Sequence, residues 1–582
     1  MRKFTCLILI LLLGWQFAFA QKLLVKGTVT GADDGLAVPG VSIIEKGTTN
    51  GTITDLDGKY QISVAENAIL SFSFVGMKTQ EVEVKGQTTI NVAMKSEAIG
   101  LEELVVVGYG TQKKTNLTGA VASVDTKVLE SRPIADVGRG LQGTTAGLNV
   151  VIPSGEIGSD PILKIRGQFA SIRGGSSPLI LLDNVEIPSI QMVNPDDIES
   201  ISVLKDAASA SIYGAKAAFG VILITTKKGA KKESVNISYS GNLSFQNISK
   251  KMEMAGIDAM EYTLSAFERV GGTVAGAFWM VTREGYEKAK VWQEKWGDII
   301  KPNDPMVYGR DWYVDANNRK IGLRTYDPYD YMVKEWTPTQ THNFSVSGKS
   351  GKTDYNIGFG YLDQSGIIKP AKEDDFRRYN GSIRVGTEIT DWLKVYAGSM
   401  YSKRAKRYAY ATNSTTADPW LYIYRWGPTY PMTTEDGDPL RSPAFEIAAA
   451  NTAFQETNYT SLNGGFTISP LKNWKINFDY THANQEYITK RPGTRFTARN
   501  TWTAAIPKND ENGNRIYVND AGEVVSSTAP GAMPAYRLSL DTYTASGSNP
   551  DHVYRYSGNS QRNTINFNTT YDFDIDLTIS RF

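Results

Sequence analysis

The residue types that usually carry catalysis are sparse and scattered in this sequence. Its only cysteine is Cys6, and its three histidines, His342, His482 and His552, stand far apart. A single cysteine excludes intramolecular disulfides and cysteine-rich zinc sites. A pair of carboxylates that could hydrolyse a glycoside cannot be picked out from the sequence. We therefore expect no enzyme, no catalytic residue, no cofactor and no metal site.

Short acidic stretches have the residue types of a calcium loop. In Asp55-Leu56-Asp57-Gly58 the later ligands of an EF-hand loop are missing. Asp436-Gly437-Asp438 and Asp510–Asn514 are equally short. Asp, Asn and Gly are also the residues that tight turns prefer. We interpret all three stretches as hairpin turns.

The run Leu104-Val105-Val106-Val107 could act through the hydrogen-bonding groups of its backbone. It stands between glutamates and glycines and is followed by polar residues. Two interpretations remain open at this point. The run is either a buried strand, or a strand kept available to extend the sheet of a partner protein by main-chain hydrogen bonds.

The first twenty residues predict export. Arg2 and Lys3 precede an apolar stretch from Phe4 to about Leu13, and Ala18-Phe19-Ala20 offers a cleavage site. We expect residues 1–20 to be a signal peptide. No later segment has 18 consecutive apolar residues, so membrane insertion would have to use β-strands. A net charge of +1 without a basic block argues against nucleic acid.

Three further regions have distinct patterns. Residues 21–96 contain short alternating strands separated by Gly and Pro turns, which predicts a β-sandwich. Residues 97–118 form a linker that includes the valine run. Residues 119–230 alternate helical and strand signals, with a capped turn at Asn194–Asp197 leading into a strand, and predict a compact α+β domain.

From residue 231 to 582 apolar and polar residues alternate with period two in about eight segments. The connections are alternately short, as at Ser350-Gly351-Lys352, and long, as in 403–457. Outer-membrane barrels combine tight periplasmic turns with long external loops in this way, and their strands carry lipid-facing and lumen-facing residues in turn. The fold class that we predict is mainly β: a sandwich, an α+β domain and the first strands of a transmembrane barrel.

One long motif carries a family resemblance. The block Asn194–Ala208, continuing through Ile212-Tyr213-Gly214 to Gly229, resembles the plug of SusC/RagA TonB-dependent transporters. Ile165-Arg166-Gly167 and the segment from Pro178 to Asp183 match other plug motifs. The plug-signature residues are Arg166, Gly167, Asp183, Asp197, Glu199, Lys205, Asp206, Tyr213 and Gly214. Residues 21–96 resemble the carboxypeptidase-regulatory-like domain that precedes many Bacteroidetes receptors, and 97–118 resemble the TonB-box region.

The resemblance implies a cell outer-membrane importer with its N-terminal domain and TonB box in the periplasm. TonB, with its inner-membrane energising complex, would dock on Leu104, Val105, Val106 and Val107. A SusD-like lipoprotein, outer-membrane lipid and a glycan or peptide substrate are the other expected partners, with oligosaccharide first and oligopeptide second. A non-transporting surface receptor or adhesin is the remaining alternative. The resemblance also suggests that Arg166 helps to hold the plug to acidic barrel residues, with a plain surface ion pair as the nearly equal alternative.

Three details qualify this expectation. The family barrel has 22 strands, so about eight make an incomplete one, and Phe582 is out of phase with the outward face. Asn184 stands where the family has Gly, and we expect the turn to survive because Asn tolerates a left-handed backbone. The substrate-binding residues are unknown: Trp420, Tyr422, Tyr424 and Trp426 suit either sugar stacking or an interfacial aromatic belt.

Overall fold

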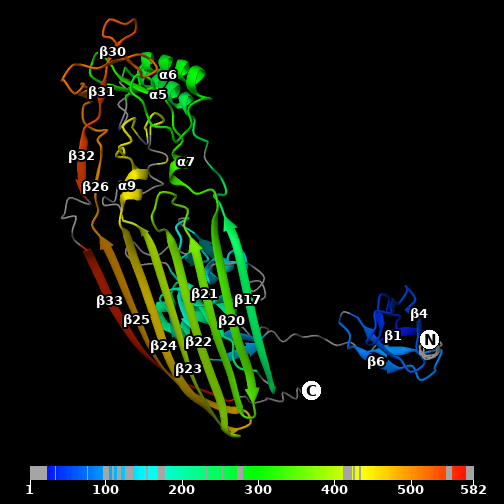
Figure 1. Cartoon of the computed structure of the whole chain (residues 1–582). Helices are drawn as coiled ribbons and strands as arrows, with labels where there is room; N and C mark the ends of the chain where they lie inside the picture. The colour runs from blue at the N-terminus through cyan, green and yellow to red at the C-terminus, as the bar shows by residue number, and fades with distance from the viewer. Residues whose placement is uncertain are drawn as a thin grey trace, which may run out of the picture. The chain divides into compact units, whose positions relative to one another are not determined.

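The computed structural model describes residues 22–571 except 33, 75, 96–103, 108–109, 114–119, 125–135, 153–154, 168–176, 231, 252, 272–279, 411–422, 424–426, 432–433 and 545–552. The expected signal peptide, Trp420, Tyr422, Tyr424, Trp426, His552 and Phe582 lie outside the described residues. The chain divides into two compact units. The first holds residues up to 105 with 112–116, and the second holds 106–111 and the chain from 117 onward (Figure 1).

The first unit contains a β-sandwich. One sheet has the order β4 (Lys59–Val64), β1 (Leu23–Gly31), β7 (Val92–Met94), and the other β3 (Gly51–Ile53), β2 (Ser42–Glu45), β5 (Ile69–Ser73), β6 (Gln80–Glu83). Alternate residues of both sheets, such as Val25, Ile43 and Phe72, form one core. The Asp55 stretch is a hairpin turn, in which the Asp55 carboxylate accepts the backbone N–H groups of Asp57 and Lys59.

The segment that contains the valine run is extended. Strand β8 (Leu104–Val107) pairs with β9 (Gly110–Lys113) in a two-stranded sheet. The run is therefore a strand, and its use as a docking site stays a prediction.

The second unit begins with an α+β domain, which we call the plug domain. Its five-stranded sheet has the order β10 (Val121–Val124), β15 (Ile198–Leu204), β16 (Val221–Thr226), β13 (Leu179–Leu182), β14 (Val185–Glu186). A separate hairpin joins β11 (Leu148–Val151) to β12 (Ile162–Ile165). The helices are α3 (Val137–Gly140), η2 (Ile190–Met192), η3 (Pro195–Asp197), α4 (Ala207–Ala210) and η4 (Ser211–Ala217).

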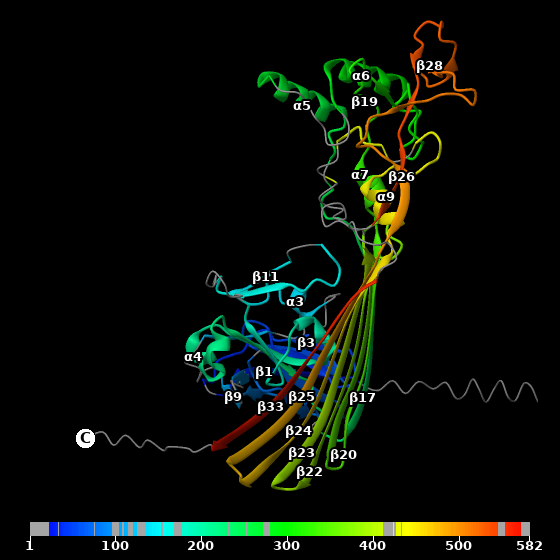
Figure 2. The ribbon, with the colours of Figure 1, turned by 90° about the vertical axis from the view of Figure 1, so that its left-hand side faces the viewer.

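A curved antiparallel sheet of eight strands follows, and the plug domain lies on its concave side (Figure 2). In sheet order, which is also chain order, the strands are β17 (Ser234–Gln246), β20 (Thr337–Ser350), β21 (Thr353–Ser365), β22 (Asp375–Thr390), β23 (Leu393–Ala409), β24 (Thr452–Leu471), β25 (Trp474–Pro492) and β33 (Val553–Tyr571). This is the partial barrel that the alternation predicted. We call the sheet the wall.

The long connections fold into a module at one end of the wall (Figure 1). It contains α5 (Ile257–Arg269), α6 (Arg283–Trp296), β18 (Trp312–Val314), β19 (Lys320–Gly322), α7 (Pro328–Met332), α9 (Pro443–Ala449), β26 (Arg495–Arg499), β27 (Ile506–Pro507), β28 (Tyr517–Val518), β29 (Val524–Val525), β30 (Met533–Pro534), β31 (Tyr536–Arg537) and β32 (Leu540–Thr544). Its core includes Trp312, Met332 and Tyr430. Among the described residues, no helix is long and apolar enough to cross a membrane.

The convex face of the wall carries a slanted apolar belt. On β17 the outward apolar residues run from Val235 to Phe245. On β33 the outward positions that precede Ile565 in the sequence, from Ser557 to Asn563, are polar. The ladder nevertheless places Val235 and Ile565 in the same row, through Gly348, Tyr355, Val385, Ala397, Gly464 and Tyr480.

The slant gives the strand tilt. The belt moves by roughly 30 Å along the strands across seven strand spacings of about 4.8 Å, which corresponds to a tilt of about 40°. Strands of transmembrane barrels tilt by about 35–45° from the axis. The belt is therefore level with a membrane plane when the strands have the tilt of a barrel.

Candidate functional site: the plug domain against the wall

The signature turn of the plug domain is seated on the wall. Asn194 caps η3 by accepting the Asp196 N–H, and Pro195 occupies the first helical position. Asp197 then accepts a hydrogen bond of 2.8 Å from the Ser382 hydroxyl of β22. Gly358 of β21 makes this approach feasible, because a Cβ there would lie 2.4 Å from the Asp197 carboxylate.

The Asp197 carboxyl is buried at this contact. Burial raises its pKa, and the neighbouring charge of Asp196 acts in the same direction, while the Ser382 hydrogen bond and the charge of Lys227 oppose the shift. The ionised carboxylate is consequently destabilised where the plug domain meets the wall.

The turn between β13 and β14 also faces the wall. Asp183 and Asn184 both have positive φ, 46° and 66°, between the paired residues Leu182 and Val185. A two-residue hairpin turn with this backbone favours Asn, Asp and Gly, so the expectation that Asn184 preserves the turn is confirmed. The Asp183 carboxylate accepts the N–H and the hydroxyl of Thr226 and lies 4.0 Å from Arg384 of β22.

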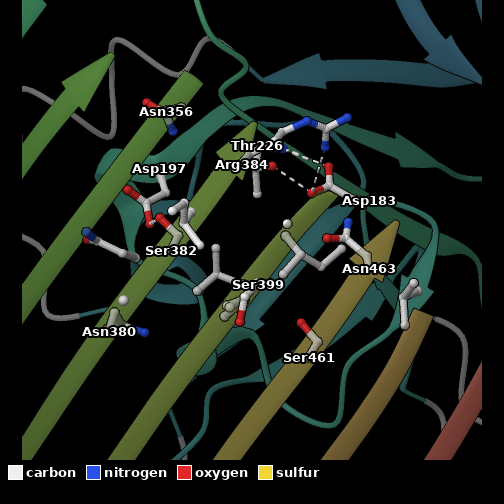
Figure 3. Close-up of a pocket in the computed structure, with 18 of the residues that line it drawn as sticks. Asp183, Asp197, Thr226, Asn356, Asn380, Ser382, Arg384, Ser399, Ser461 and Asn463 are labelled. Carbon is white, nitrogen blue, oxygen red and sulfur yellow. Dashed lines mark hydrogen bonds and ion pairs between the residues drawn. The ribbon is translucent and has the colours of Figure 1, made fainter. Parts of the chain in front are cut away.

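A small cavity lies between the two layers (Figure 3). Its volume of about 60 Å³ holds a few water molecules and excludes a sugar or a peptide. Asp183 and Asp197 line it from the plug domain, and Asn380, Ser382 and Asn463 line it from the wall. Beside the cavity, Tyr459 and Ala483 of the wall pack into the apolar core of the plug domain, so the interface combines polar and apolar contacts.

Cations of the wall fasten the other side of the plug domain. The Arg404 guanidinium donates to Asp160 at 3.1 Å, to Ser189 at 3.0 Å and to Gln191 at 3.4 Å. Lys406 pairs with Glu156, and the buried Arg378 donates to the Gln191 carbonyl oxygen at 3.2 Å. We call Arg378, Arg404 and Lys406 the wall cations.

In these ion pairs the wall supplies the cation and the plug domain the carboxylate, whereas the pairing suggested for Arg166 would have the opposite polarity and stays a prediction. Arg166, at φ 53°, directs its backbone N–H to the Gly147 carbonyl oxygen, and its charge acts on Asp206 of the plug domain itself. The wall cations occupy inward positions of β22 and β23. Sequence reasoning missed them because only the strand register shows which basic residues share the face that carries Ser382.

Asp206 joins two parts of the plug domain. One carboxylate oxygen accepts the N–H and hydroxyl of Ser209 and so caps α4, and the other accepts the Ala120 N–H at 2.5 Å. These hydrogen bonds, largest first those from the backbone of Ala120 and of Ser209, lower the Asp206 pKa to about 2. The side chain is therefore ionised at neutral pH.

The remaining signature residues shape the plug domain. The Lys205 ammonium group donates to the Ala146 carbonyl oxygen at 3.0 Å. Gly167 and Gly214 have positive φ, 62° and 65°, and Gly214 marks a kink inside η4. Tyr213 packs on a small core around Leu204, whereas Glu199 is exposed on β15.

A group of tyrosines lies on the lumen-facing side of the wall, beyond the rows that contact the plug domain. Tyr554 and Tyr556 share the inward side of β33 with Arg562, which pairs with Glu186 of the plug domain. Arg491 stands opposite Tyr554 and donates to the Tyr408 hydroxyl at 3.4 Å. We call Tyr408, Tyr487, Arg491, Tyr554 and Tyr556 the lumenal tyrosine group.

Glycine shapes this group. The Tyr487 and Tyr556 ring centroids are 5.2 Å apart, and a Cβ on Gly558 would lie 2.3 Å from the Tyr487 ring. Tyr554 and Tyr556 remain half exposed. The sequence alone did not identify these residues, because alternation does not show which of several tyrosines face the lumen beyond the plug domain.

The site thus holds two layers together without covalent chemistry. Among the described residues, no cluster of three or more His, Cys, Asp or Glu side chains is arranged to hold a metal ion. The arrangement consists of hydrogen bonds, ion pairs, apolar contacts and a small cavity. What these contacts do is hold the plug domain on the wall.

Comparison with known proteins agrees with this geometry. Residues 113–221 match the TonB-dependent receptor plug domain, and residues 25–106 match the CarboxypepD_reg-like domain. The chain is 42% identical over 375 residues to the TonB-dependent receptor P39 of Formosa agariphila, and 32% identical over 402 residues to the TonB-dependent receptor SusC of Bacteroides thetaiotaomicron. These matches cover 63% and 67% of this chain, and 31% and 35% of the relatives. The chain therefore spans about a third of each of these two relatives.

A solved structure shows the same fold. The structure of the RagAB peptide importer in the open-open state superposes with a TM-score of 0.52 at 22% identity, covering 80% of this chain and 55% of that one. At this identity the likeness concerns the fold. It supports the placement of a plug domain inside a curved transmembrane sheet.

Proposed function

The chain is that of a SusC/RagA-like TonB-dependent receptor of the outer membrane, and on this premise we propose that it serves the TonB-driven import of an oligosaccharide too large for porins. The observation that carries the transport proposal is the seating of the plug domain. It is held on the wall by hydrogen bonds, ion pairs and apolar contacts around a small cavity, so a pull could detach it without breaking a covalent bond.

TonB, energised by its inner-membrane complex, is the proposed source of that pull. We place its docking on Leu104–Val107 in the periplasm, since main-chain pairing of a strand supplies affinity along the whole segment. Strand β8 already has the extended backbone that such pairing requires. TonB would either replace β9 as the partner of β8 or pair with the opposite edge of β8.

The lumenal tyrosine group supports an oligosaccharide as the substrate. Tyrosine rings present flat apolar faces with a polar hydroxyl at the edge, which matches a sugar ring with its C–H face and hydroxyl rim. Arg491 adds planar donors beside Tyr554. The runner-up is an oligopeptide, as RagAB is a peptide importer. A SusD-like lipoprotein is the proposed partner that delivers the substrate from outside.

A first experiment tests TonB docking in the full-length receptor. Changing Val105, Val106 and Val107 to Pro, Gly and Pro should abolish energy-dependent uptake, because proline and glycine remove strand pairing. The matched control changes the same three residues to Thr, which keeps the β-branched shape and the backbone donors. Uptake that survives the Pro-Gly-Pro variant would refute docking at this segment and favour a non-transporting receptor or another docking site.

A second experiment tests the substrate class. Tyr554→Ala with Tyr556→Ala should raise the half-saturating concentration of an oligosaccharide mixture about tenfold or more, whereas Tyr401→Ala, on the convex face, should not. An unchanged oligosaccharide affinity combined with weakened peptide uptake would replace the oligosaccharide by an oligopeptide.

A further inference from the structure

Strand β10 is the first strand of the plug domain after the docking segment. It contains four residues, Val121–Val124, and lies at the edge of the five-stranded sheet beside β15. Ala120 stands thirteen residues after Val107, a stretch that spans at most about 45 Å when extended. A force applied to the docking segment is therefore transmitted along the chain to Ala120 and β10 before it reaches any other strand of the plug domain.

Two contacts hold the chain at the start of β10. The Ala120 N–H donates to the Asp206 carboxylate at 2.5 Å, and the Lys205 N–H donates to the Ala120 carbonyl oxygen at 3.1 Å. Beyond them the ladder pairs Val121 with Leu204 and ends at Val124 with Ile201. The Asp206 contact is thus the terminal bond of a short antiparallel ladder, and it is the charge-assisted one.

The direction of the pull decides how this ladder breaks. The force enters at the N-terminal end of β10, which is the end that faces Leu204 and Asp206. An edge strand pulled from one end peels away, so its hydrogen bonds carry the load one after another rather than together. The first bond in line sets the force at which peeling starts, and hydrogen bonds to charged groups are about twice as strong as neutral ones.

Asp206 is well placed to bear this load. Its second oxygen is held by Ser209, 2.8 Å from the backbone N–H and 2.7 Å from the hydroxyl. The carboxylate is thereby fixed to α4, the helix that follows β15 in the sequence. Within β10, Val124, which is 4% exposed, packs in one core of the plug domain, and the partly buried Val121 packs against another. Peeling β10 away would uncover both cores of the plug domain.

We propose that Asp206 is a clasp that closes the plug domain at the point where the TonB pull enters it, and that its release from Ala120 is the first step of plug opening. This proposal deepens the proposed function and rests on TonB docking at Leu104–Val107. The clasp itself is a property of the resting receptor and is measurable without TonB.

The first measurement is hydrogen exchange of the full-length receptor in nanodiscs without TonB. Asp206→Ser keeps a residue that caps a helix well but is too short to bond both Ser209 and Ala120. Exchange of the amides of residues 120–124 should then become about tenfold to a hundredfold faster. Ser209→Ala removes one contact of the cap and leaves the Ala120 bond, so it should leave these amides unchanged and affect only residues 207–210.

The second measurement is the force at which the C-terminal domain of TonB, bound to the receptor, first extends the plug domain. Asp206→Ser should lower this force, and Ser209→Ala should not. Equal exchange and equal force in the two variants would show a helix cap without a clasp and overturn the proposal. Failure of TonB to bind would refute the proposed docking instead, and the exchange result would still decide the clasp.

Discussion

Arg404 of β23 and Asp160 of the plug domain form an ion pair with 3.1 Å between Nη1 and Oδ1. The same guanidinium nitrogen also lies within hydrogen-bond distance of Ser189 and Gln191. One wall side chain therefore holds two segments of the plug domain that are about thirty residues apart in the sequence. The Arg404 side chain is 14% exposed and Asp160 is 49% exposed, so the pair is partly screened by solvent.

Replacing Arg404 by Met should loosen this side of the plug domain. Loss of the ion pair and hydrogen bonds should cost about 1 kcal/mol, the lower end of the range for charged contacts because Asp160 is half exposed. Exchange of the amides in residues 156–165 measures the effect. Lys403→Met is the control, since Lys403 faces the convex side and pairs with Glu456. Equal effects of the two variants would argue against a specific role of Arg404.

Gly358 should tolerate no side chain. An alanine Cβ would lie 2.4 Å from the Asp197 carboxylate and 2.6 Å from the Ser382 hydroxyl, so Gly358→Ala should push the signature turn from the wall at a cost of about 1–3 kcal/mol. Gly381→Ala on the neighbouring strand is the control, because nothing lies within 4 Å of its Cβ. Thermal unfolding of the plug domain in the two variants decides the matter, and matching curves would contradict this seating.

Asp197→Asn should strengthen the attachment of the plug domain at pH 7. Because burial raises the Asp197 pKa, ionisation destabilises the folded state above the unfolded pKa, and a neutral amide of the same shape avoids that cost. Ser382 can still donate to the amide oxygen. We expect a higher unfolding temperature and slower uptake in the variant. A lower unfolding temperature would mean that the charge itself stabilises the contact.

Acid should open β10 before the rest of the plug domain. The Asp206 pKa is lowered to about 2, so its contribution to stability is present above the unfolded value of about 3.9 and is lost as pH falls through the folded value. Exchange of residues 120–124, corrected for the intrinsic rate, should accelerate between pH 4 and pH 2. In Asp206→Ser this acceleration should be absent, and its persistence there would assign the effect to another group.

The number of strands in the wall, and which of their residues face outward, could be predicted from the sequence. The lengths of the strands could not. Period-two alternation is clear where Val235, Ile237 and Tyr239 face lipid, and eight strands were expected from it and are found. Outside the belt both faces are polar, as with Asn484 to Glu486 on β25, so the alternation fades although the strand continues. The ladder, rather than the pattern, fixes these ends.

The contacts of the site were less predictable. The signature block marks Asp197 and Asp206, but their partners Ser382 and Ala120 are 185 and 86 positions away. The helices α5 and α6 were assigned only to a long loop, although Met260 and Leu264, or Tyr286 and Ala289, are buried at helical spacing. That spacing was a usable signal. The wall cations offered none, because an inward arginine is identified only once the register of β22 and β23 is known.

The slanted belt also bears on how the wall is assembled. Each strand crosses the belt with a different stretch of its own sequence. The register between neighbouring strands therefore also determines how deep each strand lies in the membrane. A slip of two residues between β24 and β25 would keep every side chain on its proper face, yet it would displace one half of the belt by about 7 Å along the strands relative to the other. Burial of the belt in the bilayer therefore favours the correct register over slipped registers that hydrogen bonding and alternation alone would not distinguish.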